Sequence, residues 1–278
     1  MTPRERFRAV AHFKRPDRLP WIEIMWDETV INWIKQGLPV EKTVCDPSYD
    51  FVLGGTTTGL VWVNPRTFDP SKYFGYENFV SPTSIIIDLS PLPRFLTKTV
   101  EETERYIVYR EPNGVLRRQR KDKVYIMPEY LDFPVKSLED WEKYRDERFN
   151  PKDPRRYPKN WSDDYVEWFE NSTTPNGLYL GGFYCLGREV MGTVGFVSAF
   201  YKDPELVRRM MSDHANFLIE ALNDAVETLK SRIDFVYWHE DMAHKHGPNI
   251  SPKLFREFML PHYKRVTDFF KKYGIDTI

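Results

Sequence analysis

The chain has 278 residues, of which 41% are hydrophobic and 15% aromatic, enough for a sizeable core and unlike a disordered protein. Forty basic and 41 acidic residues leave a net charge of −1, so charge gives no reason to expect nucleic acid or an anionic membrane as a partner. The two cysteines, Cys45 and Cys185, cannot build a disulfide framework, and no apolar run approaches the ~20 residues that span a bilayer. Because the chain starts without a signal peptide, a reducing cytoplasm is the expected compartment.

The first residues predict a helix followed by a buried strand. Thr2 can cap a helix and Glu5 completes a capping box, so we expect the helix to run to about His12. After a polar turn, the apolar run 19–26 predicts a buried first strand. The stretch 27–80 is rich in aromatic residues, proline and glycine, and it predicts no clear order of elements.

The next part of the chain predicts a decoration on the main fold. Residues 84–87 form a short β-branched run that ends at Asp88. Residues 106–110 and 115–117 read as two strands with an Asn-Gly pair between them, which predicts an inserted β-hairpin.

From residue 177 onward, strands and amphipathic helices alternate regularly. Apolar positions recur with a helical period after each strand, which predicts helices that pack on a sheet. The expected elements are a strand at 177–182, a helix from near 188, a helix capped by Asp203, a strand at 233–238, a helix from 251 to about 274, and a strand beginning at 275.

Strand–helix alternation favours a parallel sheet with helices outside, and we expect an α/β fold of the (β/α)8 TIM-barrel type. A complete barrel needs ~250 residues without insertions, and the insertions here leave room for only about six of the eight units. We therefore expect residues 1–278 to be one barrel domain that does not close by itself, with the last two units missing after Ile278.

Two segments together resemble the uroporphyrinogen decarboxylase superfamily. One is the opening, residues 2–21, and the other is residues 247–263, with the sequence GPNISPKLFREFMLPHY. The resemblance implies a TIM barrel that is often dimeric, so a homodimer is possible. It implies two chemistries: decarboxylation of uroporphyrinogen without a cofactor, or methyl transfer between corrinoids and thiols or folate with a zinc-bound thiolate. Fold alone does not choose between them.

The expected mouth of the barrel is acidic. The decarboxylase branch places two arginines just after the first strand to hold substrate carboxylates, which suits the guanidinium fork. Residues 21–34 contain Glu23, Asp27 and Glu28 but no Lys or Arg. An acidic mouth would repel an octacarboxylate, so we expect no decarboxylation of uroporphyrinogen, and we expect Glu23 to face the substrate.

Other residues at the expected mouth are less clearly matched to the family. The family tyrosine is not clearly present, because Tyr184 comes too early, but Tyr184 is a candidate substrate-binding residue. Arg188 and Glu189 are candidates for an anion clamp and its partner, or else form an ordinary ion pair of an exposed helix. Asp88 matches the family aspartate that lies under the pyrrole nitrogens, or else is a turn residue before Pro91.

The richest polar cluster directly follows the strand 235–238. His239 is a candidate proton donor, and Glu240 and Asp241 are candidates for acid–base chemistry or substrate binding. In a barrel this position is the catalytic rim, so we expect all three to share one pocket with Asp88. The alternative is a solvated loop.

No metal site can be assigned within residues 1–278. The methyl-transfer branch uses a His-x-Cys pair near the strand that begins at Ile275, and zinc is possible only with ligands beyond Ile278. The first functional hypothesis is a methyltransferase-like enzyme that acts on a small molecule or a corrinoid protein. The alternatives are a cofactor-free uroporphyrinogen decarboxylase and a non-catalytic binding barrel.

Overall fold

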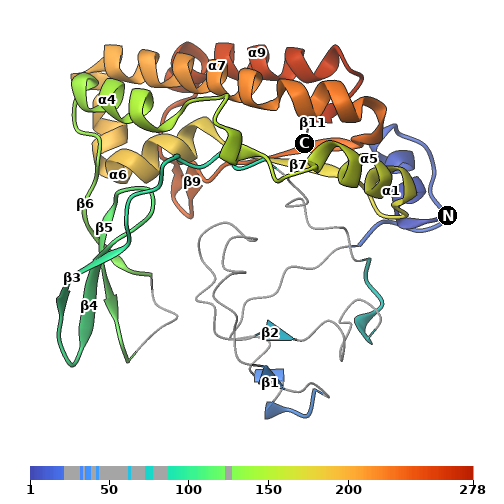
Figure 1. Ribbon diagram of the computed structural model, residues 1–278, viewed down its shortest axis with the longest axis horizontal. Helices are drawn as coiled ribbons and strands as arrows, with labels where there is room; N and C mark the ends of the chain where they lie inside the picture. Colours follow the sequence, from blue (N-terminus) through green and yellow to red (C-terminus); the bar gives the residue numbers. More distant parts are fainter. Residues whose placement is uncertain are drawn as a thin grey trace. The chain divides into compact units, whose positions relative to one another are not determined.

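The computed structural model describes residues 1–21, 32–33, 35–38, 42–43, 62–63, 73–77, 87–122 and 127–277 (Figure 1). The chain divides into two compact units. The first comprises Met1–Ser84 and Ser172–Asn176, and the second comprises Ile85–Asn171 and Gly177–Ile278. The expectation of one barrel domain over the whole chain stays a prediction, and each unit is described by itself.

The first unit begins with the predicted helix α1 (Pro3–Ala11). The Thr2 hydroxyl accepts from the Glu5 backbone N–H at 3.2 Å, and the Glu5 carboxylate accepts from the Thr2 backbone N–H at 2.7 Å, which completes the capping box. Two-residue strands β1 (Lys42–Thr43) and β2 (Trp62–Val63) pair antiparallel. Most of the predicted first strand, residues 19–26, lies outside the described residues, and so does Glu23.

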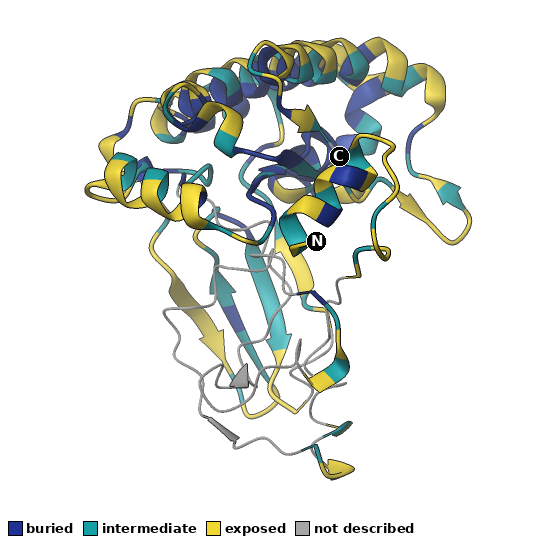
Figure 2. Ribbon diagram, turned by 90° about the vertical axis from the view of Figure 1, so that its right-hand side faces the viewer, coloured by how far each residue is buried: buried dark blue, intermediate teal, exposed yellow. Residues whose placement is uncertain are grey.

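The second unit is built on a parallel sheet of three strands, in the order β11–β8–β7. The strands are β7 (Gly177–Gly181), β8 (Phe235–His239) and β11 (Asp276–Thr277). One face of this sheet is apolar and wholly buried, because Leu178, Leu180 and Val236 have no exposed surface. Figure 2 shows the buried residues gathered where the helices face these strands.

Three long helical regions cover that face. The first two are α6 (Phe183–Lys202) and α7 (Pro204–Leu229). The third runs from Pro252 to Lys271 and consists of α8 (Pro252–Leu254), a π-helical turn (Phe255–Met259) and α9 (Leu260–Lys271). The predicted caps are confirmed, since Asp203 accepts from the Leu206 N–H at 3.1 Å and Ser251 accepts from the Leu254 N–H at 3.3 Å. The first of these helices begins earlier than the predicted start near Arg188.

Gly192 interrupts α6 with a kink. Its φ is 72° and its ψ is 158°, a conformation that disfavours any residue with a side chain. A Cβ at this position would also meet the ring of Phe133 at 2.5 Å. The segment after β6 that contains Phe133 lies against α6 near Gly192, because the Val135 backbone N–H donates to the Val190 carbonyl at 3.0 Å.

The predicted hairpin is part of a larger antiparallel sheet of four strands, β3–β4–β5–β6. The hairpin strands are β4 (Tyr106–Arg110) and β5 (Leu116–Arg120), flanked by β3 (Lys98–Glu102) and β6 (Glu129–Asp132). The hairpin itself is confirmed, and the two outer strands carry too little alternation to have been predicted.

Short elements complete the second unit. Helix α4 (Leu138–Arg148) packs on α7, where the Trp141 indole N–H donates to Asp213 at 3.0 Å. The remaining elements are α5 (Trp161–Asn171), the 3-10 turns η2 (Pro154–Arg156) and η3 (Lys230–Arg232), and the antiparallel pair β9 (Ala243–His244) and β10 (Gly247–Pro248).

The α/β class is therefore confirmed, but the strands of the described residues do not close a barrel, because the parallel sheet has three strands. Truncation after about six units stays a prediction. Among the described helices, none combines the length and the apolar character needed to cross a bilayer.

Candidate active site at the carboxyl ends of two parallel strands

The carboxyl ends of β7 and β8 lie side by side. Gly181 is in register with His239, and the next residue, Gly182, donates its N–H to the His239 carbonyl at 2.9 Å. Active sites of parallel barrels lie at this end of the strands. The structure brings six of the predicted site residues to this rim, namely Tyr184, Arg188 and Glu189 in the first turns of α6, and His239, Glu240 and Asp241 at the end of β8.

The carboxylate of Glu240 caps α6 from another strand. It accepts from the backbone N–H groups of Tyr184 and Cys185, each at 3.0 Å, and from the Tyr263 hydroxyl. Gly182 is the N-cap residue and has no side chain to do this. Burial raises the pKa of Glu240, and the three hydrogen bonds oppose that rise. The carboxylate thus ties β8, α6 and α9 together.

Asp241 and Arg188 form an ion pair at the edge of the rim. Their side chains are 53% and 32% exposed, so water screens the pair and it contributes little to stability. The predicted anion clamp is thus already occupied, and the acid that occupies it is Asp241 rather than Glu189.

Glu189 differs from the other rim acids because none of the described residues forms a hydrogen bond or ion pair with it. The residue keeps an exposed surface. Burial by the surrounding protein nevertheless raises the pKa of its carboxyl to about 7, the carboxylates of Glu111 and Glu240 add to this rise, and Arg188 opposes it. Glu189 is therefore a carboxyl without a partner among the described residues, and the largest charge effect on it, that of Arg188, opposes the rise of its pKa.

His239 belongs to a row of rings on the sheet face opposite the helices. The rings of Tyr179 and Tyr237 stack at 5.8 Å and 26°, and the His239 ring stacks on Tyr179 at 6.2 Å and 24°. Burial is the main cause that raises the pKa of the Tyr179 phenol to about 12, and Glu189 contributes to this rise. The row thus reaches the rim near Glu189.

Asp88 is held in a turn. Its carboxylate accepts from the Ser90 N–H at 3.0 Å and pairs with Arg94 at 2.7 Å. Its carbonyl accepts from the buried guanidinium of Arg156 at 2.6 Å. These contacts are those of the turn aspartate that was the alternative interpretation. A pocket shared by Asp88 and the rim residues stays a prediction.

Tyr184 and Cys185 are buried. Tyr184 has no exposed side-chain surface and packs on the Phe196 ring at 5.5 Å, so it presents only its backbone N–H to Glu240. The described residues bring together no three His, Cys, Asp or Glu side chains that could hold a metal ion. Cys185 is buried, and burial raises its thiol pKa to about 12, which disfavours the thiolate that zinc needs. Glu23 lies outside the described residues.

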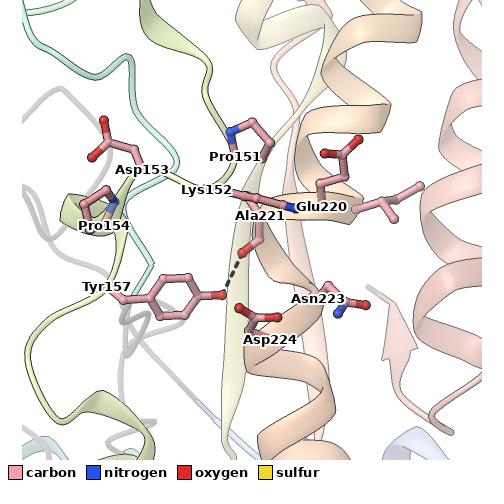
Figure 3. Close-up of a pocket in the computed structure, with 10 residues that line it drawn as sticks. Pro151, Lys152, Asp153, Pro154, Tyr157, Glu220, Ala221, Asn223 and Asp224 are labelled. Carbon is pink, nitrogen blue, oxygen red and sulfur yellow. Dashed lines mark hydrogen bonds between the residues drawn. The ribbon is translucent and has the colours of Figure 1, made fainter.

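A hollow lies away from this rim, between the segment 151–157 and the outer face of α7 (Figure 3). The Tyr157 hydroxyl donates to the Ala221 carbonyl across it at 2.7 Å. Of the three acids that line it, Asp153, Glu220 and Asp224, the first is paired with Arg155 at 2.6 Å. None of the residues predicted from the sequence lines this hollow.

Two residues near this rim, Tyr263 and Tyr179, were not among the site residues predicted from the sequence. Tyr263 lies in the predicted helix after Ser251, and Tyr179 lies in the predicted strand. Tyr179 could have been found from the alternation of β7, since it lies on the face opposite Leu178 and Leu180, whereas Tyr263 has no such signal within its helix.

A search of curated proteins finds no match to this chain. Residues 182–278 match the family model described as Uroporphyrinogen decarboxylase (URO-D). The matched segment begins at Gly182 and contains α6, β8 and the rim residues His239, Glu240 and Asp241. It also contains the second of the two segments that carry the resemblance seen in the sequence. This segment, about a third of the chain, is thus similar to the uroporphyrinogen decarboxylase superfamily.

Proposed function

We propose that the protein is a methyltransferase-like enzyme of this superfamily, which moves a methyl group between a small molecule and a corrinoid or another one-carbon carrier. The observation that carries the proposal is the charge of the rim. Among the described residues, the three acids Glu189, Glu240 and Asp241 lie at the carboxyl ends of β7 and β8 together with Arg188, whose guanidinium is bound to Asp241.

An acidic rim argues against a polycarboxylate substrate. A carboxylate is held best by a free guanidinium fork, which forms two parallel hydrogen bonds. The Arg117 guanidinium pairs with Glu111 at 2.9 Å, and Arg94 pairs with Asp88 at 2.7 Å. In sequence, the stretch 21–34 contains three acids and no Lys or Arg, although its acids lie outside the described residues. A neutral or weakly polar methyl donor meets less repulsion at such a rim than uroporphyrinogen does.

The described residues do not supply a zinc site, so no step is assigned to zinc. What they supply is a surface for a small substrate. The stacked rings of Tyr179, Tyr237 and His239 provide an aromatic wall, and Glu189 provides an open carboxyl beside it. A corrinoid protein is the expected macromolecular partner for the methyl carrier.

Two assays test the proposal with the full-length protein. In the first, reduced cobalamin is incubated with methanol, methylamines, methoxylated aromatics or methyltetrahydrofolate, and methylcobalamin is followed by its absorbance. In the second, uroporphyrinogen is supplied and coproporphyrinogen is measured by chromatography. We expect methylcobalamin from at least one donor and no coproporphyrinogen. Catalytic formation of coproporphyrinogen would support the decarboxylase alternative, and the absence of both products would support the binding barrel.

A further inference from the structure

The carboxyl groups at the rim differ in the hydrogen bonds and ion pairs that each of them forms. Sequence reasoning gave acid–base chemistry to Glu240 and Asp241, because both follow directly on a buried strand. A group that exchanges a proton with a substrate needs an oxygen that the substrate can reach. The contacts of each carboxylate therefore show which of them has such an oxygen.

Glu240 has both oxygens engaged by the protein. One oxygen accepts from the Tyr184 N–H and the Tyr263 hydroxyl, and the other accepts from the Cys185 N–H. Protonating this carboxylate would put a proton against N–H groups that need an acceptor. A Cβ at Gly182 would lie 2.0 Å from its carboxylate carbon, so the group is enclosed as well as bound.

Asp241 and Asp88 are also committed. Asp241 pairs with Arg188, and Asp88 pairs with Arg94 and accepts from Ser90. Each of these two carboxylates therefore already has a guanidinium partner within the protein.

Glu189 is the rim carboxyl with no such partner among the described residues, and it interacts electrostatically with groups on several elements. It lies one helical turn after Cys185, whose backbone N–H donates to Glu240. Electrostatic interactions connect it with groups on the antiparallel sheet, on α4, on β7, on α6 itself and after β8. These groups are Glu111, Tyr130, Tyr144, Tyr179, Arg188 and Glu240.

We propose that Glu189 is the carboxyl that exchanges a proton with the bound substrate, and that Glu240 is a positioning residue that holds the rim in place. The inference deepens the proposed function and rests on it for the identity of the substrate. In the methyl-transfer step, an electron pair of the acceptor forms the new bond to the methyl carbon. The bond from that carbon to the substrate heteroatom breaks, and the heteroatom keeps the pair and takes the O–H proton of Glu189. Glu189 becomes a carboxylate and regains its proton from water.

The electrostatics of the site fit this role. Burial, helped by Glu111 and Glu240, raises the pKa of Glu189 to about 7, so both protonation states are populated near neutral pH. A general acid or base works best when its pKa lies near the operating pH. The neighbouring tyrosines stay protonated in this range, since burial raises the pKa of Tyr179 to about 12.

The first test needs no substrate. The full-length protein, labelled with carbon-13 at its glutamate carboxyl groups, is titrated by NMR as wild type and as Glu189→Gln, Glu240→Gln and Glu205→Gln. Glu205 is an exposed acid in the first turn of α7 and serves as the matched control. We expect one resonance that titrates near pH 7, is lost in Glu189→Gln and is kept in the other two variants. Its persistence in Glu189→Gln would overturn the proposal.

The second test uses the methyl donor that the cobalamin assay identifies. Glu189→Gln keeps the size of the side chain, so we expect kcat to fall about 100-fold or more with little change in KM, and the pH dependence near 7 to disappear. Glu240→Gln should keep that pH dependence even where the rate falls. The reverse pattern would assign the proton to Glu240. If no donor is turned over, the proposed function fails, while the NMR titration still decides whether Glu189 is the carboxyl that titrates near pH 7.

Discussion

The carboxylate of Glu240 fills the space that a side chain at Gly182 would occupy. A Cβ built on Gly182 would lie 2.0 Å from the Glu240 carboxylate carbon, far closer than such atoms approach. The helix α6 therefore begins at a residue that cannot cap it, and the cap comes from the end of a neighbouring parallel strand. Sheet, helix and rim are joined at this contact.

Substituting Gly182 by alanine should destabilise the protein through that contact alone. The backbone at Gly182 has φ −78° and ψ 169°, which alanine adopts without strain. We expect the new methyl group to displace Glu240 and to lower the free energy of unfolding by about 1–3 kcal/mol. Gly181→Ala is the control, because a Cβ there meets nothing within 4 Å. Urea denaturation measures both, and equal losses would show that the contact with Glu240 is not the cause.

Removing the Glu240 carboxylate should cost more than removing its exposed neighbour. Glu240→Ala leaves the N–H groups of Tyr184 and Cys185 without their acceptor, and we expect a loss of about 2 kcal/mol from the missing cap. Asp241→Ala breaks only the half-exposed pair with Arg188, so we expect less than about 1 kcal/mol. Chemical denaturation of the two variants gives the comparison. A smaller loss in Glu240→Ala than in Asp241→Ala would contradict the capping role.

The helix starts that the sequence predicted are those with a local signal. Thr2, Asp203 and Ser251 each accept from a backbone N–H three residues later, so the motif lies within four residues of sequence. The start of α6 has no such signal, because its cap comes from Glu240 on another strand. The helix was therefore expected to begin too late.

The sequence indicates where the acids of the rim gather, but it does not indicate which of them has a carboxylate without a partner. Strand ends and acids identify where Glu189, Glu240 and Asp241 gather, since parallel strands end at one edge of the sheet. Which carboxylate is free depends on partners that lie far along the chain. Arg156 shows the same limit, because its burial against the carbonyls of Asp88 and Ser90 follows no local pattern.

The raised pKa of Glu189 should appear in the pH dependence of stability. Its ordinary value is 4.5 and its value in the folded protein is about 7. Between these values the folded state binds more protons than the unfolded state, so the contribution of Glu189 to stability is complete below pH 4.5 and is lost as the pH rises through 7. Glu189→Gln removes this slope. We expect its free energy of unfolding, relative to wild type, to rise between pH 5 and pH 8. Parallel pH profiles of the two proteins would contradict the raised pKa.

His214 should produce the opposite pH dependence. Its ring is 7% exposed and lies 5.3 Å from the ring of Phe183 and 6.2 Å from that of Phe217. Burial among these rings lowers the pKa of His214 to about 4, against 6.5 for an ordinary histidine. Between those two values the unfolded state binds the proton and the folded state does not, so stability falls as the pH falls.

His214→Phe removes that titrating group and keeps an aromatic ring in the core. The shift of the pKa from 6.5 to about 4 corresponds to a loss of up to about 3 kcal/mol on acidification. The wild type should therefore lose more stability between pH 7 and pH 4 than the variant does, whatever the cost of the larger ring at pH 7. Urea denaturation at several pH values measures this difference, with the exposed His246→Phe as control. Equal acid sensitivity of His214→Phe and wild type would mean that His214 takes up its proton in the folded protein as readily as in the unfolded chain.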